Sequence, residues 1–167
     1  MCSADVVRAG LVFVPLNPAY TLREVAHVVG DAQPAVFVCE PDPRGALGSV
    51  ADECRASLVA LTGDHRDALM QLARAAAPDL PPVACAPDDP AAILYTSGTT
   101  GRPKGAMIRH ATLLSTARTL APPSPFTPDD APLHALPFFL PPGPFVAAPA
   151  TFLPRCLPPF PPCLPLR

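Results

Sequence analysis

The chain contains 167 residues, of which 49% are hydrophobic, and its formal net charge is −2. This length suits one domain or a piece of a larger one. No block of Lys or Arg occurs, so the composition gives no support for nucleic acid or an anionic membrane as a partner. No apolar run approaches the ~20 residues of a membrane-spanning helix, and the first residues lack the pattern of a signal peptide. We therefore expect a cytoplasmic protein with no membrane span, unless a preceding segment carries a targeting sequence.

The six cysteines are scattered along the chain. No two of them make a C-x-x-C motif, and no histidine lies at zinc-ligand spacing from a cysteine pair. Without a secretory signal, such cysteines are typical of reduced, mostly buried thiols. We therefore expect neither a disulfide framework nor a protein-bound metal.

Strand-like and helix-like segments alternate through the first part of the chain. Strands are predicted at residues 10–16, 35–39, 57–61 and 91–96, where short apolar runs end at turn-forming residues. Helices are predicted at residues 21–30, 46–55, 64–77 and 109–120, where apolar residues recur at the helical period. The alternation predicts an α/β protein with a mainly parallel sheet and flanking helices. In such sheets the ligand lies beyond the carboxyl ends of the strands.

Two of the predicted helices carry more specific signals. Thr21 and Glu24 have the spacing of a capping box, and Gly30 is placed to end that helix. In the helix at 64–77, the side chains of Leu69, Leu72 and Ala76 share one face and are expected to point inward. Between this helix and the strand at 91–96, a proline-rich surface connection is expected.

Beyond Ala121 the composition changes sharply. Sixteen of the 27 prolines lie there, together with only four charged residues. Proline removes a backbone donor and interrupts both helices and strands. A loop with Asp129 and Asp130 and a short strand at 133–136 are expected, and the rest is predicted to be irregular or disordered.

The strand at 91–96 runs into the string T-S-G-T-T-G-R-P-K-G, residues 96–105. Its hydroxyls can donate to phosphate oxygens, and its glycines allow close backbone approach or a positive φ. Successive N–H groups can form an anion-binding concavity, and the lysine adds a mobile positive charge. The residues predicted to bind phosphate are Thr96, Ser97, Gly98, Thr99, Thr100, Gly101, Lys104 and Gly105.

Other phosphate-binding loops do not fit this string. A Walker A loop needs G-x-x-x-x-G-K-[ST], and neither Gly98 nor Gly101 is followed by Gly-Lys at that spacing. No G-x-G-x-x-G occurs either. The P-loop, kinase-type and dinucleotide-binding hypotheses therefore lose support, and a flexible surface turn rich in Ser, Thr and Gly is the structural alternative.

The string resembles the phosphate-binding signature of the adenylate-forming, or AMP-binding, superfamily, which includes acyl-CoA synthetases. The similarity extends to residues 8–38 and 126–139, and the latter segment is most similar to malonyl-CoA synthetases. The resemblance implies that residues 1–121 are a partial, N-terminal AMP-binding α/β domain with its phosphate-binding loop at 94–105. Residues 122–167 would continue the same domain as a proline-rich, degraded or disordered tail.

The activity implied by the resemblance is that of an ATP-dependent acid–thiol ligase. A carboxylate attacks the α-phosphorus of ATP to give an acyl-adenylate and pyrophosphate, and CoA then displaces AMP to give a thioester. Lys104 would be the catalytic residue, because it would stabilise the phosphates and the departing pyrophosphate by position and charge. The implied ligands are a small-molecule carboxylate, ATP, Mg²⁺ and CoA.

The chain also departs from the family pattern. Where malonyl-CoA synthetases have two histidines in P-x-F-H-x-H-G, this chain has Leu140 and Pro142. The resemblance implies that the family segments for adenine, Mg²⁺ and ribose and the adenylation lysine would lie outside this stretch of sequence. We therefore expect a fragment of an acyl-CoA ligase that is inactive alone, and the alternative is a non-catalytic remnant that at most binds nucleotide. His110 and His134 are expected to be structural.

Overall fold

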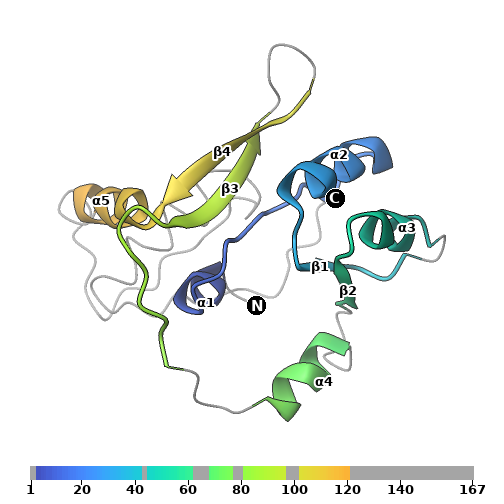
Figure 1. The fold of residues 1–167 in the computed structure, drawn as a ribbon, viewed down its shortest axis with the longest axis horizontal. Coiled ribbons are helices and arrows are strands. Elements are labelled where there is room, and N and C mark those ends of the chain that lie inside the picture. Colours follow the sequence, from blue (N-terminus) through green and yellow to red (C-terminus); the bar gives the residue numbers. More distant parts are fainter. Residues whose placement is uncertain (1–2, 43–44, 62–67, 77–80, 97–101, 121–167) are drawn as a thin grey trace, which may run out of the picture. The chain divides into compact units, whose positions relative to one another are not determined.

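The computed structural model describes residues 3–42, 45–61, 68–76, 81–96 and 102–120. The described elements are, in chain order, α1 (Ser3–Arg8), α2 (Leu22–Ala32), β1 (Val36–Cys39), α3 (Ala46–Glu53), β2 (Ser57–Ala60), α4 (Ala68–Ala75), β3 (Pro90–Thr96), β4 (Lys104–Arg109) and α5 (His110–Leu120) (Figure 1). They belong to two compact units. Among the described residues, the first unit holds those within Met1–Pro15, Ala84–Leu94 and Met107–Leu120, and the second holds those within Leu16–Val83 and Tyr95–Ala106.

The second unit is built around the parallel pair β1–β2. Val36 lies opposite Ser57 and Cys39 opposite Ala60, and α3 connects the two strands. A parallel pair needs such a crossover because its strands run in the same direction. One further backbone bond follows the ladder, from Leu61 N to Cys39 O at 2.8 Å.

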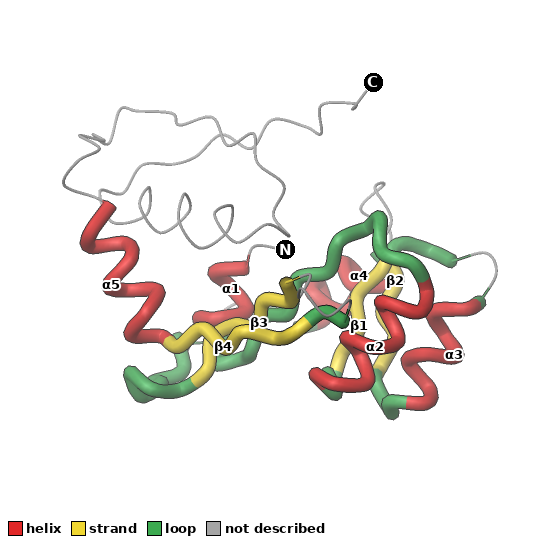
Figure 2. Tube along the Cα trace, turned by 90° about the horizontal axis from the view of Figure 1, so that it is seen from above, coloured by secondary structure: helices red, strands yellow, loops and turns green. Residues whose placement is uncertain are grey.

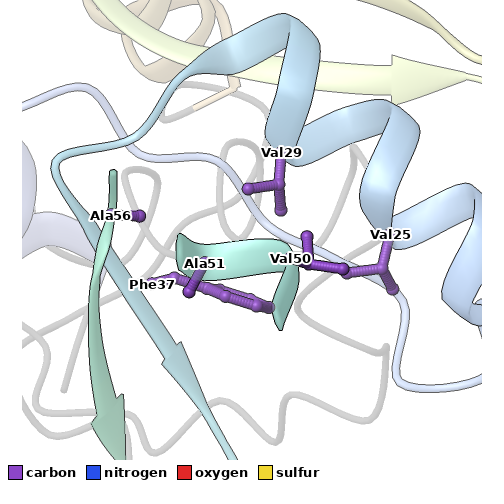
Figure 3. Packing of buried hydrophobic residues seen from close by; sticks show 6 residues of the cluster. All are labelled: Val25, Val29, Phe37, Val50, Ala51 and Ala56. Carbon is purple, nitrogen blue, oxygen red and sulfur yellow. The ribbon is translucent and has the colours of Figure 1, made fainter. Parts of the chain in front are cut away.

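Small aliphatic side chains surround one aromatic ring in the core of this unit. The buried cluster consists of Val25, Val29, Phe37, Val50, Ala51 and Ala56. Figure 3 shows Val25 and Val29 pointing from α2 towards Val50 of α3, with the ring of Phe37 beside them. α2 and α3 lie side by side next to β1 and β2 (Figure 2). Because close-packed interiors leave little freedom for shifts, this packing fixes the position of α2.

The ends of α2 have identifiable local causes. The predicted capping box is confirmed, because Thr21 N donates to Glu24 Oε2 at 2.8 Å and Glu24 N donates to Thr21 Oγ1 at 3.4 Å. The prediction that Gly30 ends the helix is wrong, since α2 continues to Ala32. Gln33 ends it in the left-handed region, with φ of 46°. The following Pro34 disfavours a right-handed helical conformation at Gln33 and so accounts for the later end.

The first unit is organised around β3. Phe13 forms a parallel bridge with Ala92, in which Phe13 N donates to Ala91 O and Ile93 N donates to Phe13 O, both at 3.0 Å. The strand predicted at 10–16 is therefore wrong in extent. Pro15 cannot continue the ladder because it has no N–H. Buried Ala92 and Leu94 lie in a small cluster with Phe13, Ile108 and Leu113.

The predicted α/β class is confirmed. The helices predicted at 46–55 and 109–120 and the strands at 35–39, 57–61 and 91–96 are present with small shifts at their ends. Of the helix predicted at 64–77, the described part is α4, which contacts β2. Leu72 is 59% exposed and Ala76 is also exposed, so the inward orientation predicted for these two is wrong, whereas Leu69 is half-buried.

Several predictions concern other features of the chain. The connection at 81–89 contains no helix or strand and is mostly exposed, as expected. Cys39 and Cys54 carry thiols and not a disulfide. None of the helices in the described ranges is long and apolar enough to cross a membrane. The loop with Asp129 and Asp130, the strand at 133–136 and the rest of the predicted tail lie outside the described residues.

Candidate functional site

The predicted phosphate-binding string links two paired strands. Thr96 is the last residue of β3, and Lys104 is the first residue of β4. β3 and β4 pair in a two-stranded sheet, and their arrows run in opposite directions (Figure 1). The string therefore connects the two arms of a hairpin. We call residues 95–96 and 102–105 the loop stems.

Three predicted site residues lie in the loop stems. Thr96, Lys104 and Gly105 are all exposed. Gly105 is part of β4 and does not have a positive φ. Of the two roles predicted for the glycines, the one that fits Gly105 is to let a ligand come close to the backbone. The predicted residues Ser97, Gly98, Thr99, Thr100 and Gly101 lie outside the described residues.

The stems carry positive charge. Arg102 and Lys104 are both exposed, and Pro103 between them is half-buried. In the described part of the chain, the ion pair that forms is Arg109–Asp88, at 2.7 Å, and it does not involve either stem cation. The ammonium group of Lys104 can therefore approach an anionic ligand without first leaving a carboxylate among these residues.

The far end of the hairpin is held by the segment that precedes β3. Arg109 Nη1 donates to Asp88 Oδ1, and His110 N donates to Asp89 O at 3.1 Å. His110 begins α5, so its backbone serves the start of that helix. The structural role expected for the side chain of His110 stays a prediction.

Two side chains of α2 contact the loop stems. The hydroxyl of Tyr95 donates to Asp31 Oδ2 at 2.5 Å, and His27 Nε2 lies 3.0 Å from the carbonyl oxygen of Pro103. A carbonyl oxygen only accepts, so the Nε2 of His27 must carry the proton. Partial burial, together with the hydrogen bond to Asp31 and its negative charge, raises the pKa of Tyr95 well above its ordinary value. The phenol is therefore held in its neutral, donating form.

His27 and Asp31 are absent from the residues predicted by sequence. Their contacts join positions 76 and 64 residues apart along the chain. The sequence did indicate that His27 and Asp31 lie one helical turn apart, on the side of the helix away from the valines. This spacing places both on one face of α2, but it does not predict which residues they contact.

Within the described ranges, no three His, Cys, Asp or Glu side chains gather in a way that could hold a metal ion. The described side chains therefore offer no protein cage for Mg²⁺.

Known proteins resemble the chain over most of its length. The family described as "AMP-binding enzyme" matches residues 6–151. A mitochondrial malonate–CoA ligase of Xenopus laevis is 32% identical over 140 residues, which cover 82% of this chain and 24% of that protein. A feruloyl-CoA synthase of an Amycolatopsis species is 33% identical over 132 residues, which cover 79% of this chain and 25% of that protein.

A solved structure gives the same assignment. ATP-bound MatB of Rhodopseudomonas palustris is 43% identical, superposes with a TM-score of 0.85, and is matched over 92% of this chain and 31% of its own. The chain thus spans less than a third of each of these relatives. The fold and the sequence agree, and the chain belongs to the AMP-binding enzyme family, whose members similar to it include AMP-forming acyl-CoA ligases.

Proposed function

We propose that the chain carries the phosphate-binding part of an acyl-CoA ligase that activates a carboxylate with ATP. The observation that supports this most directly is the hairpin, which places Thr96 at the end of one strand and Lys104 at the start of the next. Both side chains are exposed and flank the Gly-, Ser- and Thr-rich string. ATP is present in a 43% identical relative, MatB.

The proposed chemistry of the stems is positioning and charge stabilisation. Lys104 would bind phosphate oxygens of ATP and stabilise the negative charge that gathers on the departing pyrophosphate. The hydroxyl of Thr96 would donate to the same phosphates, and Gly105 would let the β4 backbone approach them. We propose that Ser97, Gly98, Thr99, Thr100 and Gly101 complete this set.

We further propose malonate as the acyl substrate. The support is similarity to a malonate–CoA ligase and to MatB, of which MatB has the higher identity. The feruloyl-CoA synthase is similar over nearly the same length, so an aromatic acid is the competing substrate class.

Replacing Lys104 tests the phosphate site directly. Lys104→Met keeps most of the length of the side chain and removes its charge, so the affinity for ATP should fall at least about tenfold, or about 1.4 kcal/mol. Isothermal titration calorimetry on the 167-residue chain measures this. Arg118→Met is the matched control, because it removes a charge from the exposed surface of α5. Equal ATP affinities for Lys104→Met and the unaltered chain would refute the proposed site.

The reaction itself is tested in a complete ligase. Residues 6–120 can replace the matching segment of MatB, and ATP–pyrophosphate exchange can then be measured with malonate, acetate and ferulate. We expect exchange with malonate, and a loss of about 100-fold or more in the Lys104→Met version, as when a preorganised charge-stabilising group is removed. Exchange that is faster with ferulate would contradict the malonate proposal. Exchange by the 167-residue chain alone would contradict its expected inactivity.

A further inference from the structure

We propose that His27 and Asp31 are positioning residues that hold the two loop stems at a fixed separation for phosphate binding. The proposal deepens the proposed function and rests on it. Neither side chain needs to touch ATP, because each acts through a stem residue: Asp31 through Tyr95, and His27 through Pro103.

The two contacts lie on opposite sides of the predicted phosphate string. Tyr95 immediately precedes Thr96, and Pro103 immediately precedes Lys104. Each contact therefore ends one residue away from a proposed phosphate ligand. Both contacts lie within the second compact unit, which contains α2 together with Tyr95–Ala106.

The spacing of the two helical residues suits the spacing of the two stems. His27 and Asp31 are four positions apart, which places them on one face of α2, about 6 Å apart along its axis. Neighbouring strands in a sheet lie about 4.8 Å apart. One helix face can therefore reach both arms of a hairpin at once, with one residue on each arm.

The hydrogen-bond chemistry of the two contacts is complementary. The imidazole Nε2 of His27 donates to Pro103 O, because a carbonyl oxygen can only accept. The phenol of Tyr95 stays protonated because its pKa is raised, and it donates a hydrogen bond to the carboxylate of Asp31. A hydrogen bond with an ionised partner is stronger than a neutral one.

α2 can act as a support because its opposite side is packed. Val25 and Val29 are buried against α3 and Phe37, so the helix does not depend on the stems for its position. Residues 96–105 include three glycines, and glycine loses more conformational freedom on ordering than other residues. If both stems are already fixed, less conformational entropy is lost when ATP binds. This is the general benefit of preorganisation.

A purely electrostatic role for Asp31 makes the opposite prediction. A carboxylate near bound phosphates repels them, so Asp31→Asn and Asp31→Ala would both strengthen anion binding. A positioning role separates the two variants, because Asn keeps an acceptor oxygen for Tyr95 and Ala does not. In the same way, His27→Gln keeps an N–H donor for Pro103 O and His27→Ala removes it.

Hydrogen–deuterium exchange of the 167-residue chain tests the contacts themselves. Asp31→Ala, His27→Ala and Tyr95→Phe should speed exchange of the stem amides about fivefold, the loss expected for one hydrogen bond of ordinary net strength. Asp31→Asn and His27→Gln should stay close to the unaltered chain. Amides of α3 are the internal control. Unchanged stem exchange in the Ala variants, or an equal rise in α3, would overturn the proposal.

The link to phosphate is tested with inorganic tripolyphosphate as the probe. Asp31→Ala and His27→Ala should weaken its binding about fivefold through the loss of preorganisation, and Asp31→Asn and His27→Gln should restore it. Stronger binding by both Asp31 variants would refute positioning in favour of charge. If Lys104→Met binds tripolyphosphate as well as the unaltered chain, the proposed phosphate site fails. Hydrogen exchange of the stem amides still decides whether the contacts of Asp31 and His27 hold the stems. Failure of the proposed phosphate site and failure of the positioning role are therefore distinguishable.

Discussion

Tyr95 combines a half-buried ring with a hydroxyl that donates a hydrogen bond to the carboxylate of Asp31. Its pKa is raised by burial, by the hydrogen bond to Asp31 and by that residue's charge. A group whose folded pKa is raised stabilises the fold fully below its unfolded pKa, about 10 for tyrosine, and this contribution is lost as the pH rises through the folded value. We therefore expect the chain to lose stability in alkaline solution, and Tyr95→Phe to lose less.

The titration can be followed optically because the chain has two tyrosines and no tryptophan. In a Tyr20→Phe background, the phenolate absorbance reports on Tyr95 alone. Its midpoint should lie above about 10, the ordinary tyrosine pKa, and should fall towards that value in Asp31→Ala. An unchanged midpoint in Asp31→Ala would show that the hydrogen bond does not hold the proton.

At this scale, part of the candidate site could be predicted from the sequence. Lys104 and Thr96 belong to a contiguous string, so their chemistry and their order were visible. His27 and Asp31 were not, because each meets a partner more than 60 residues away. Helical spacing shows which residues share a face, and only the fold shows what that face meets.

At the scale of elements, α2 depends on the capping box at its first turn. Thr21→Ala removes the side chain that accepts from Glu24 N and should cost about 0.5–2 kcal/mol in the free energy of unfolding. Thr21→Ser keeps a hydroxyl and is the control. Urea denaturation measures both, and equal midpoints for Thr21→Ala and the unaltered chain would contradict the cap.

The same cap has a defined pH dependence. The side chain of Thr21 donates to Glu24 and is the larger cause of its lowered pKa, and the backbone N–H of Thr21 is the smaller cause. A lowered folded pKa stabilises the fold above the unfolded value, about 4.3 for glutamate, and this contribution is lost as the pH falls through the folded value. The difference between Thr21→Ala and the unaltered chain should therefore shrink in acid.

Element prediction succeeded where local signals were strong and failed where pairing decided the outcome. The capping box correctly predicted the start of α2, and short apolar runs correctly predicted β1 and β2. β4 was not predicted, because Lys104–Arg109 has charged ends and a glycine and becomes a strand by pairing with β3. The strand predicted at 10–16 reduces to the bridge at Phe13 because Pro15 stops the ladder.

At the scale of the whole molecule, stability of the second unit rests on a small core with one aromatic side chain. Phe37→Ala leaves a cavity beside Val50 and Ala51 and should cost about 3–5 kcal/mol. Since a typical domain is stable by only about 5–15 kcal/mol, this loss should shift the urea midpoint strongly. Leu58→Ala is the control, because Leu58 is 43% exposed. Similar losses for the two variants would show that the cluster does not dominate stability.

Three independent observations support the membership of the chain in the AMP-binding family. The string at 96–105, the alternating elements and the superposition on MatB each point to the same fold. Relatives named for malonate and for ferulate are similar to the chain at nearly the same identity.

One helix carries both the core valines and the side chains that meet the loop stems. Val25 and Val29 set the rotation of α2 about its axis, and that rotation aims His27 and Asp31. A change of side-chain volume at Val29, which is 2% exposed, would therefore move His27 and Asp31 together with the helix. Under the proposed function, a core substitution would in this way alter phosphate binding without touching the loop stems.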